Sequence, residues 1–228
     1  MLTSHIATVL RQAVVTFANK EMFYQNLEIL KALLDKTTGE DVNLHPQFMT
    51  EDLWQRPNKA PVTYVDIYED YNLTIGIFIL KPNMKLPLHN HPQMHGLIKV
   101  VGGKIKVTSY SLNTEKTQQL DNKNAAVVTK FITAERSVET VLETHSECCL
   151  LEPEVRNLHE IESVGGPAAF IDILAPPYET ATPGGNVRKC SYYRVLREIA
   201  PSVFRLQEIS SPSWYWTDSF PYTGPDLS

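Results

Sequence analysis

The sequence predicts a mainly β protein, an antiparallel sandwich or barrel that follows a helical N-terminal segment. From residue 62 onward, short stretches rich in Val, Ile, Tyr and Phe follow one another closely, with no helical period between them. Turn signals separate these stretches, at Pro82-Asn83, Gly102-Gly103, Asp121-Asn122 and Gly165-Gly166. Residues 3–36, by contrast, carry apolar side chains at helical spacing.

We expect two helices within residues 3–36, with a break near Asn19 and Lys20. Apolar residues recur at spacings of three and four on either side of this break, as they do on one face of a helix. Thr3 or Ser4 is the candidate N-cap of the first helix. Residues 37–61 are polar and contain prolines, which predicts a linker or irregular segment.

These features divide the chain into three parts. Residues 1–60 are expected to form a helical cap and linker, and residues 61–209 the barrel. Residues 210–228 are rich in aromatic residues and proline, which favours a non-regular strap packed on the barrel over a disordered tail. We expect a monomer, because the chain brings its own helical cap; docking of the aromatic tail on a second subunit is the alternative.

The composition excludes several classes of protein. Of the 228 residues, 43% are hydrophobic and 21% charged, which is typical of a globular chain with a substantial core. A net charge of −5 argues against nucleic acid as the main partner. The sequence contains no apolar run of membrane-spanning length, so we expect no membrane partner.

The cysteines and the N-terminus bear on localisation. Three cysteines, two of them adjacent, do not form a disulfide framework, which predicts a reducing compartment. The first residues lack a basic region followed by an apolar run, so a secretory signal is not expected. We expect a cytoplasmic protein; a mitochondrial presequence is the alternative, because Arg11 lies in an amphipathic stretch without acidic residues.

Three histidines lie within seven residues, in the sequence LPLHNHPQMHG. Residues i and i+2 of a strand point to the same face, so His89 and His91 direct two imidazoles to one point. Neutral imidazoles are natural ligands of a divalent transition metal. The alternative is a pair of surface histidines on an edge strand, which the apolar neighbours Pro87 and Leu88 disfavour.

The spacing resembles the first motif of the cupins, which is HxH, three or four residues, Glu, six residues, Gly. His95 and Gly102 stand at the Glu and Gly positions, so the carboxylate ligand is replaced by an imidazole. His95 is therefore either a further ligand or a group that lines or supports the site. The resemblance implies a cupin, a double-stranded β-helix jelly-roll barrel, with an N-terminal helical segment.

A cupin needs one more histidine, on a later strand. His159 has hydrophobic neighbours and lies between a proline turn and a glycine turn, which suits an inward position, whereas His145 lies among polar residues. Three neutral histidines leave the full positive charge on the metal, and this favours an anionic substrate atom such as a thiolate. A Zn²⁺ ion with an activated water is the chemical competitor.

Three separated blocks resemble the thiol dioxygenases typified by animal 2-aminoethanethiol (cysteamine) dioxygenase and the plant cysteine oxidases. The blocks are HNHPQMHGLIKVVGGKIKV, RNLHEIESVGGPAAFIDILAPPYE and CSYYR. The resemblance implies an Fe(II) enzyme without haem that adds both atoms of O2 to a thiol, giving a sulfinic acid. The implied substrates are cysteamine, which becomes hypotaurine, and the N-terminal cysteine of proteins, which links the reaction to oxygen sensing through the Arg/N-degron pathway.

The resemblance also assigns residues. It places the iron ligands at His89, His91 and His159, and it places Asp172 and Tyr178 near the substrate. Asp172 is then either a group that takes an amine or thiol proton, or a buried carboxylate that orients a ligand histidine.

Cys190 and Tyr192 share a strand face in the third block. Some relatives carry a thioether cross-link between such a cysteine and tyrosine. Ordinary packing of a buried cysteine beside an aromatic ring is the alternative.

Three hypotheses about function follow. The first is the thiol dioxygenase. The second is a cupin metalloenzyme of another class, such as a zinc or manganese hydrolase or isomerase, which metal content would distinguish. The third is a non-catalytic cupin binding module, which three convergent histidines argue against. The sequence does not decide between cysteamine and an N-terminal cysteine as the substrate.

Overall fold

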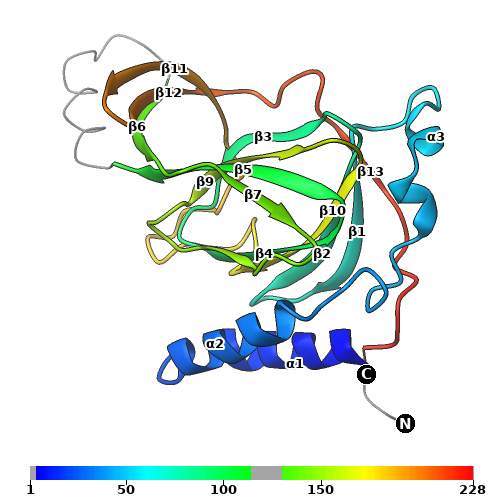
Figure 1. Ribbon diagram of the computed structural model, residues 1–228. Helices are drawn as coiled ribbons and strands as arrows, with labels where there is room; N and C mark the ends of the chain where they lie inside the picture. Colours follow the sequence, from blue (N-terminus) through cyan, green and yellow to red (C-terminus); the bar gives the residue numbers. More distant parts are fainter. Residues whose placement is uncertain (1–3, 114–129, 228) are drawn as a thin grey trace.

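The computed structural model describes residues 4–113 and 130–227, and it contains two facing β-sheets with helices packed outside them (Figure 1). One sheet has six strands, in the order β13 (Thr217–Ser219), β1 (Val62–Glu69), β2 (Thr74–Leu80), β10 (Ala168–Ala175), β4 (His95–Gly102) and β8 (Cys149–Leu151). The other has seven, in the order β6 (Phe131–Arg136), β12 (Val203–Ile209), β11 (Tyr192–Ala200), β3 (Lys85–Asn90), β9 (Leu158–Ser163), β5 (Lys104–Leu112) and β7 (Thr140–Glu143). Strand β5 also pairs with β6, and the mainly β prediction is confirmed.

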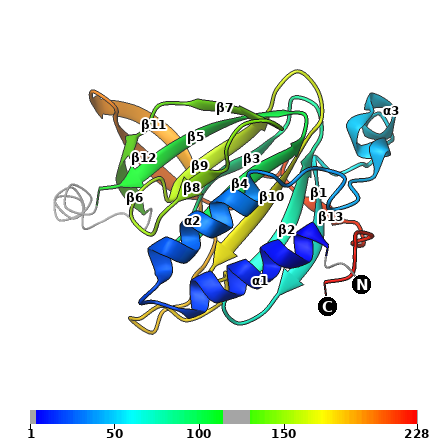
Figure 2. The same ribbon diagram turned by 60° about the horizontal axis from the view of Figure 1, so that its bottom comes forward.

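Two helices form a hairpin over the outer face of the six-stranded sheet, as Figures 1 and 2 show. They are α1 (His5–Ala18) and α2 (Phe23–Leu34), so the predicted break between two helices is confirmed. Ser4 caps α1, because its hydroxyl oxygen accepts the backbone N–H of Ala7 at 3.3 Å. The alternative cap, Thr3, lies outside the described residues.

The segment after α2 is more regular than predicted. It contains the 3₁₀ helix η1 (Pro46–Met49) and the short helix α3 (Glu51–Trp54). The His45 ring accepts the backbone N–H of Gln47 at 3.2 Å and caps η1. These turns bury Phe48 and Trp54, and the Trp54 indole donates to the Phe48 carbonyl oxygen at 3.0 Å. Burial of two large aromatic side chains explains why this polar segment is ordered.

Strand alternation separates two apolar layers on β10. Phe170 faces the inside of the barrel, where it packs with Leu80 and Ile98. Ile171 and Ile173 face the opposite side, and they pack in one cluster with the apolar stripes of α1 and α2. Each such buried side chain contributes about 1.5–3 kcal/mol relative to exposure. The helices thus cover the outer layer and leave the barrel interior for the site.

The C-terminal segment crosses the barrel and contains one short strand, where a strap without regular structure was predicted. Strand β13 pairs in parallel with β1, with Val62 opposite Thr217. A salt bridge from Lys59 to Asp218, at 2.6 Å, holds the same region. The backbone N–H of Phe220 donates to the Tyr64 carbonyl oxygen at 3.0 Å. These bonds fix the segment on the barrel.

Two predictions fall partly on residues that the structure does not describe. The turn at Asp121-Asn122 and the beginning of the predicted strand at residues 125–132 lie outside the described ranges, and β6 begins at Phe131. None of the helices in the described residues is long and apolar enough to cross a membrane.

Candidate metal centre

Strand pairing brings three histidines together inside the barrel. His89 on β3 lies opposite His159 on β9 in the antiparallel register. His91 follows the end of β3, where its backbone N–H donates to the Asn157 carbonyl oxygen at 2.7 Å. The three buried side chains offer ligand nitrogens that all lie within 4.8 Å of one another. The Nε2 atom of His91 is 3.1 Å from that of His89 and 3.0 Å from that of His159.

Hydrogen bonds on the far side of two rings fix their tautomers. The His89 Nδ1 atom is 2.7 Å from the Pro87 carbonyl oxygen, which only accepts, so Nδ1 carries the proton. The Tyr178 hydroxyl donates to the Asn90 carbonyl oxygen at 2.6 Å. Because that hydroxyl has one proton, it accepts from His91 Nδ1 at 3.0 Å. Both histidines therefore direct the lone pair of Nε2 toward the centre.

Burial keeps the imidazoles neutral. Desolvation lowers the pKa of His89 to about 4 and lowers the pKa values of His91 and His159 well below their ordinary value. Lone pairs that face one another at about 3 Å repel unless a cation lies between them. Imidazole nitrogens bind transition-metal ions at about 2.1 Å, which places adjacent ligand nitrogens roughly 3 Å apart. The three histidines therefore fit a divalent transition metal.

The histidines line a cavity of about 80 Å³ in the barrel interior. Four other residues from the predicted site line it as well, namely Asp172, Tyr178, Cys190 and Tyr192. The remaining walls are mostly apolar, and they are made by Phe78, Leu86, Pro87, Ile161, Leu174 and Tyr215. The cavity is therefore small, with mostly apolar walls and a few polar groups beside the histidines.

Asp172 is the acidic residue of this cavity. It lies on the inward face of β10, between Gly76 of β2 and Ile98 of β4, and only 7% of it is exposed. Burial raises the pKa of its carboxyl group to about 7. Its Oδ1 atom has no hydrogen-bond partner among the described residues. An unpartnered buried carboxylate oxygen is available to a donor on a bound molecule.

Cys190 lies between two tyrosines. Burial raises the pKa values of Tyr178 and Tyr192, and the thiol lies close enough to their hydroxyl groups to raise these pKa values further. Burial also raises the pKa of the thiol itself. Tyr192 in turn lies opposite His89 in the pairing of β11 with β3. The cysteine and both tyrosines thus form one connected group beside the metal ligands.

The structure does not bring His95 to this centre. On β4, Ile98 and Val100 face the barrel interior, whereas Leu97 and Val101 face the helices, and His95 shares the phase of the second pair. Its ring centroid lies 4.8 Å from that of Phe23, and it lines a separate pocket. The prediction that His95 lines the metal site is therefore corrected, because spacing alone does not give the phase of the strand after the turn.

Sequence reasoning missed Tyr215 as a wall of the cavity. It comes from the C-terminal segment, and its ring centroid lies 5.9 Å from that of Tyr192. The many aromatic residues of this segment predicted that it packs on the barrel, but they did not indicate which of them meets the cavity. His145, which lies among polar residues in the sequence, is exposed and does not line the cavity.

Comparisons with known proteins assign the chain to a family. The family model PCO_ADO matches residues 33–227. The chain belongs to this family. It is 33% identical to 2-aminoethanethiol dioxygenase of Mus musculus, over 99% of this chain and 97% of that protein. It is 34% identical to the Homo sapiens enzyme of the same name, over 90% and 82%. The resemblance inferred from the three sequence blocks is confirmed.

More distant matches include a plant enzyme and two solved structures. Plant cysteine oxidase 2 of Arabidopsis thaliana is 29% identical, over 74% of this chain and 57% of that protein. A double-stranded beta-helix protein of Klebsiella pneumoniae aligns with a TM-score of 0.38 at 15% identity, covering 63% of this chain and 93% of that one. A cupin superfamily protein of Desulfitobacterium hafniense aligns with a TM-score of 0.35 at 8% identity, covering 57% and 89%.

Proposed function

We propose that this chain is an iron-dependent thiol dioxygenase that adds both atoms of O2 to the sulfur of its substrate, giving a sulfinic acid. The observation that carries the proposal is the convergence of three neutral histidine Nε2 atoms in a cavity that also holds a carboxylate oxygen without a partner among the described residues. Related chains are named as dioxygenases and oxidases of thiol compounds. The hydrolase, isomerase and binding-module hypotheses have no such support.

The residues of the cavity have distinct roles in this proposal. His89, His91 and His159 would hold Fe(II), which supplies O2 activation and a binding position for the thiolate. Tyr178 keeps the His91 ring in the orientation and tautomer that a ligand needs, because its hydroxyl accepts from Nδ1. The apolar walls exclude water from the reacting sulfur.

Asp172 would bind the amine or take a proton. Both candidate substrates, cysteamine and an N-terminal cysteine, carry a primary amine two carbons from the sulfur. The free Oδ1 atom of Asp172 would accept a hydrogen bond from this amine. Because burial raises the carboxyl pKa to about 7, the group can also exchange a proton near neutral pH.

The size of the cavity limits what enters it. A cavity of about 80 Å³ accommodates a molecule of only a few heavy atoms, since a single water needs at least about 10–15 Å³ of such space. Cysteamine, or the first residue of a protein substrate, would occupy it, and the remainder of a protein would stay outside. With an N-terminal cysteine as substrate, the sulfinic acid product would enter the Arg/N-degron pathway and report O2.

The proposal is tested by O2 consumption of the Fe(II)-loaded protein. Cysteamine, free cysteine and a peptide with an N-terminal cysteine would be compared, and mass spectrometry would detect a product heavier by two oxygen atoms. We expect this product from cysteamine or the peptide, with loss of activity in His159→Ala and retention in the surface variant His145→Ala. No uptake with any thiol at stoichiometric iron would overturn the proposal.

We also propose a thioether bond between Cys190 and Tyr192. Cys190 and Tyr192 line the same cavity, and the two groups are close enough for the thiol to add to the effect of burial in raising the pKa of the tyrosine. Formation of the C–S bond removes one hydrogen from the thiol and one from the ring, and O2 accepts the two electrons and two protons. Protein incubated with Fe(II) and O2 should contain a species lighter by two hydrogen atoms, which Cys190→Ser cannot form. An unchanged mass after prolonged turnover would contradict the bond.

A further inference from the structure

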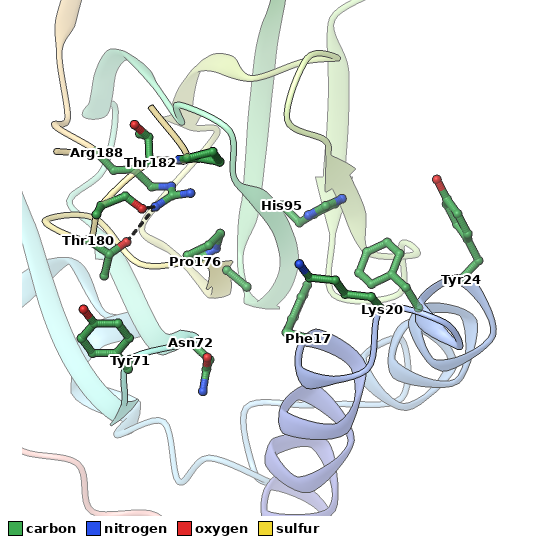
Figure 3. Close-up of a pocket in the computed structure, with 14 residues that line it drawn as sticks. Phe17, Lys20, Tyr24, Tyr71, Asn72, His95, Pro176, Thr180, Thr182 and Arg188 are labelled. Atoms are coloured by element: carbon green, nitrogen blue, oxygen red, sulfur yellow. Dashed lines mark hydrogen bonds between the residues drawn. The ribbon is translucent and has the colours of Figure 1, made fainter. Parts of the chain in front are cut away.

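A second, larger pocket lies outside the barrel, between the turn that joins α1 to α2 and the segment from Ala175 to Arg188 (Figure 3). Its volume is about 730 Å³, within the range of about 300–1,000 Å³ that is typical of small-molecule sites. It shares no lining residue with the catalytic cavity. It is therefore a separate compartment of the described structure.

The charges around this pocket differ from those of the chain as a whole. The chain carries 26 acidic residues and a net charge of −5, yet none of the described residues that line the pocket is Asp or Glu. Two of them, Lys20 and Arg188, are cationic. Figure 3 shows Lys20 extending from the helical turn toward the middle of the pocket, with Arg188 on the opposite wall. The pocket is thus a locally positive site on an acidic protein.

Arg188 is the unusual member of this wall, because it is charged and only 5% exposed. Its guanidinium donates to the Thr180 hydroxyl at 3.1 Å and to the Ala181 carbonyl oxygen, both of which are neutral. Its Nε atom has no partner, and no carboxylate in residues 4–113 and 130–227 forms a salt bridge with it. A buried cation without a counter-charge is costly, and an anionic ligand would lower that cost.

Aromatic rings supply the apolar part of the pocket. Phe17 and Phe23 pack against His95, with ring centroids 6.2 Å and 4.8 Å from that of the imidazole. Tyr71 and Tyr24 also line the pocket and are 83% and 76% exposed. Exposed aromatic side chains around a concave surface offer contact area for a flat apolar molecule.

We propose that this pocket binds a small organic anion, a carboxylate joined to a flat apolar body. The carboxylate lies between Lys20 and Arg188, and the apolar body lies against Phe17 and Tyr71. Charge complementarity selects the acid, because the lining offers cations and no carboxylate. This proposal depends neither on the metal nor on the reaction assigned to the barrel.

One segment of the chain contributes to both this pocket and the catalytic cavity, although the two are separate. The segment that forms its Arg188 wall also carries Tyr178, whose hydroxyl contacts His91 Nδ1 inside the barrel. The anion therefore binds behind the catalytic cavity and leaves the thiol position free. Any effect of the ligand on turnover is expected to be non-competitive with the thiol.

The test compares 2-naphthoate with its neutral counterpart 2-naphthamide by isothermal titration calorimetry on the full chain. We expect saturable binding of the acid and about tenfold weaker binding of the amide, because a charge-assisted contact is lost. Lys20→Gln should weaken binding of the acid about fivefold, and Tyr71→Ala about as much. Lys36→Gln, an exposed lysine just after α2 that does not line the pocket, should leave the Kd unchanged.

Three results would overturn the proposal. The first is absence of saturable binding of 2-naphthoate, and the second is equal affinity for the acid and the amide. The third is binding that Lys20→Gln does not change but His159→Ala abolishes, which would place the acid on the metal. Lys20 and Tyr71 are surface residues, so their variants test the site without disturbing the fold.

Discussion

The two faces of the six-stranded sheet hold pockets of opposite character. The inner face contributes to a cavity of about 80 Å³ that contains the buried side chains of His91, His159 and Asp172. The outer face contributes to an open pocket of about 730 Å³ with two cationic walls. Asp172 and Ala175 lie on the same strand, β10, yet they line different pockets. The phase of one strand therefore decides whether a side chain meets the metal ligands or the helices.

Replacing one histidine on each face gives the largest expected difference. His159→Ala should lose bound metal and at least about a thousandfold in kcat/KM, because the site retains only two imidazoles. His95→Ala should keep its metal, because the His95 ring packs against Phe23 outside the barrel. Metal content and O2 uptake measure both effects. Loss of metal in His95→Ala would show that the outer face reaches the centre.

Asp172, on the inner face of the sheet, should make the stability of the protein depend on pH. Burial raises the pKa of this carboxyl group from 3.8 in the unfolded chain to about 7 in the folded protein. The folded state therefore holds the proton more tightly, and stability falls as pH rises from about 4 to about 7. Between pH 5 and pH 8 the metal-free protein should lose roughly 2–3 kcal/mol more of its free energy of unfolding than Asp172→Asn. Urea titrations at both pH values check this, and equal losses would contradict it.

Tyr178 lies in the segment that borders both pockets, but its hydroxyl acts on the metal site of the inner one. Tyr178→Phe keeps the ring but removes the hydroxyl that accepts from His91 Nδ1. We expect the affinity for Fe(II) to fall about 10- to 100-fold, as is usual when a group that orients a metal ligand is removed. Competition with a chelator would measure the Kd. Tyr222→Phe, which removes a hydroxyl bonded to the Pro225 carbonyl oxygen, is the matched control and should bind normally.

The smallest expected effect concerns the C-terminal wall of the inner cavity. Tyr215→Ala should raise the KM for a small thiol about three- to tenfold with less change in kcat, because an apolar contact near Tyr192 is lost. Trp214→Ala removes a neighbouring ring that does not line the cavity, and it should leave the KM unchanged. Steady-state kinetics would compare the KM values of the two variants. Equal effects would show that Tyr215 does not contact the substrate.

Local patterns in the sequence predicted most of the fold, whereas the site needed pairing and phase. Helical spacing predicted α1 and α2, and short stretches rich in Val, Ile, Tyr and Phe between turn signals predicted the strands. The HxH spacing placed two imidazoles on one face, but His159 joins them only through the register of β3 with β9. His95 and Tyr215 show the limit. The direction of the His95 side chain depends on the phase of β4 after a turn. The position of Tyr215 depends on where the C-terminal segment crosses the barrel.

The attachment of the C-terminal segment makes this enzyme vulnerable to trimming. Exopeptidase removal of the chain from Pro212 onward would take away Tyr215, the Lys59–Asp218 salt bridge and β13 together. The freed backbone groups of β1 would then form a sheet edge open to other chains, which is a template for aggregation. Protein trimmed at its C-terminus would therefore lose both activity and solubility, although all three metal ligands remain in the chain.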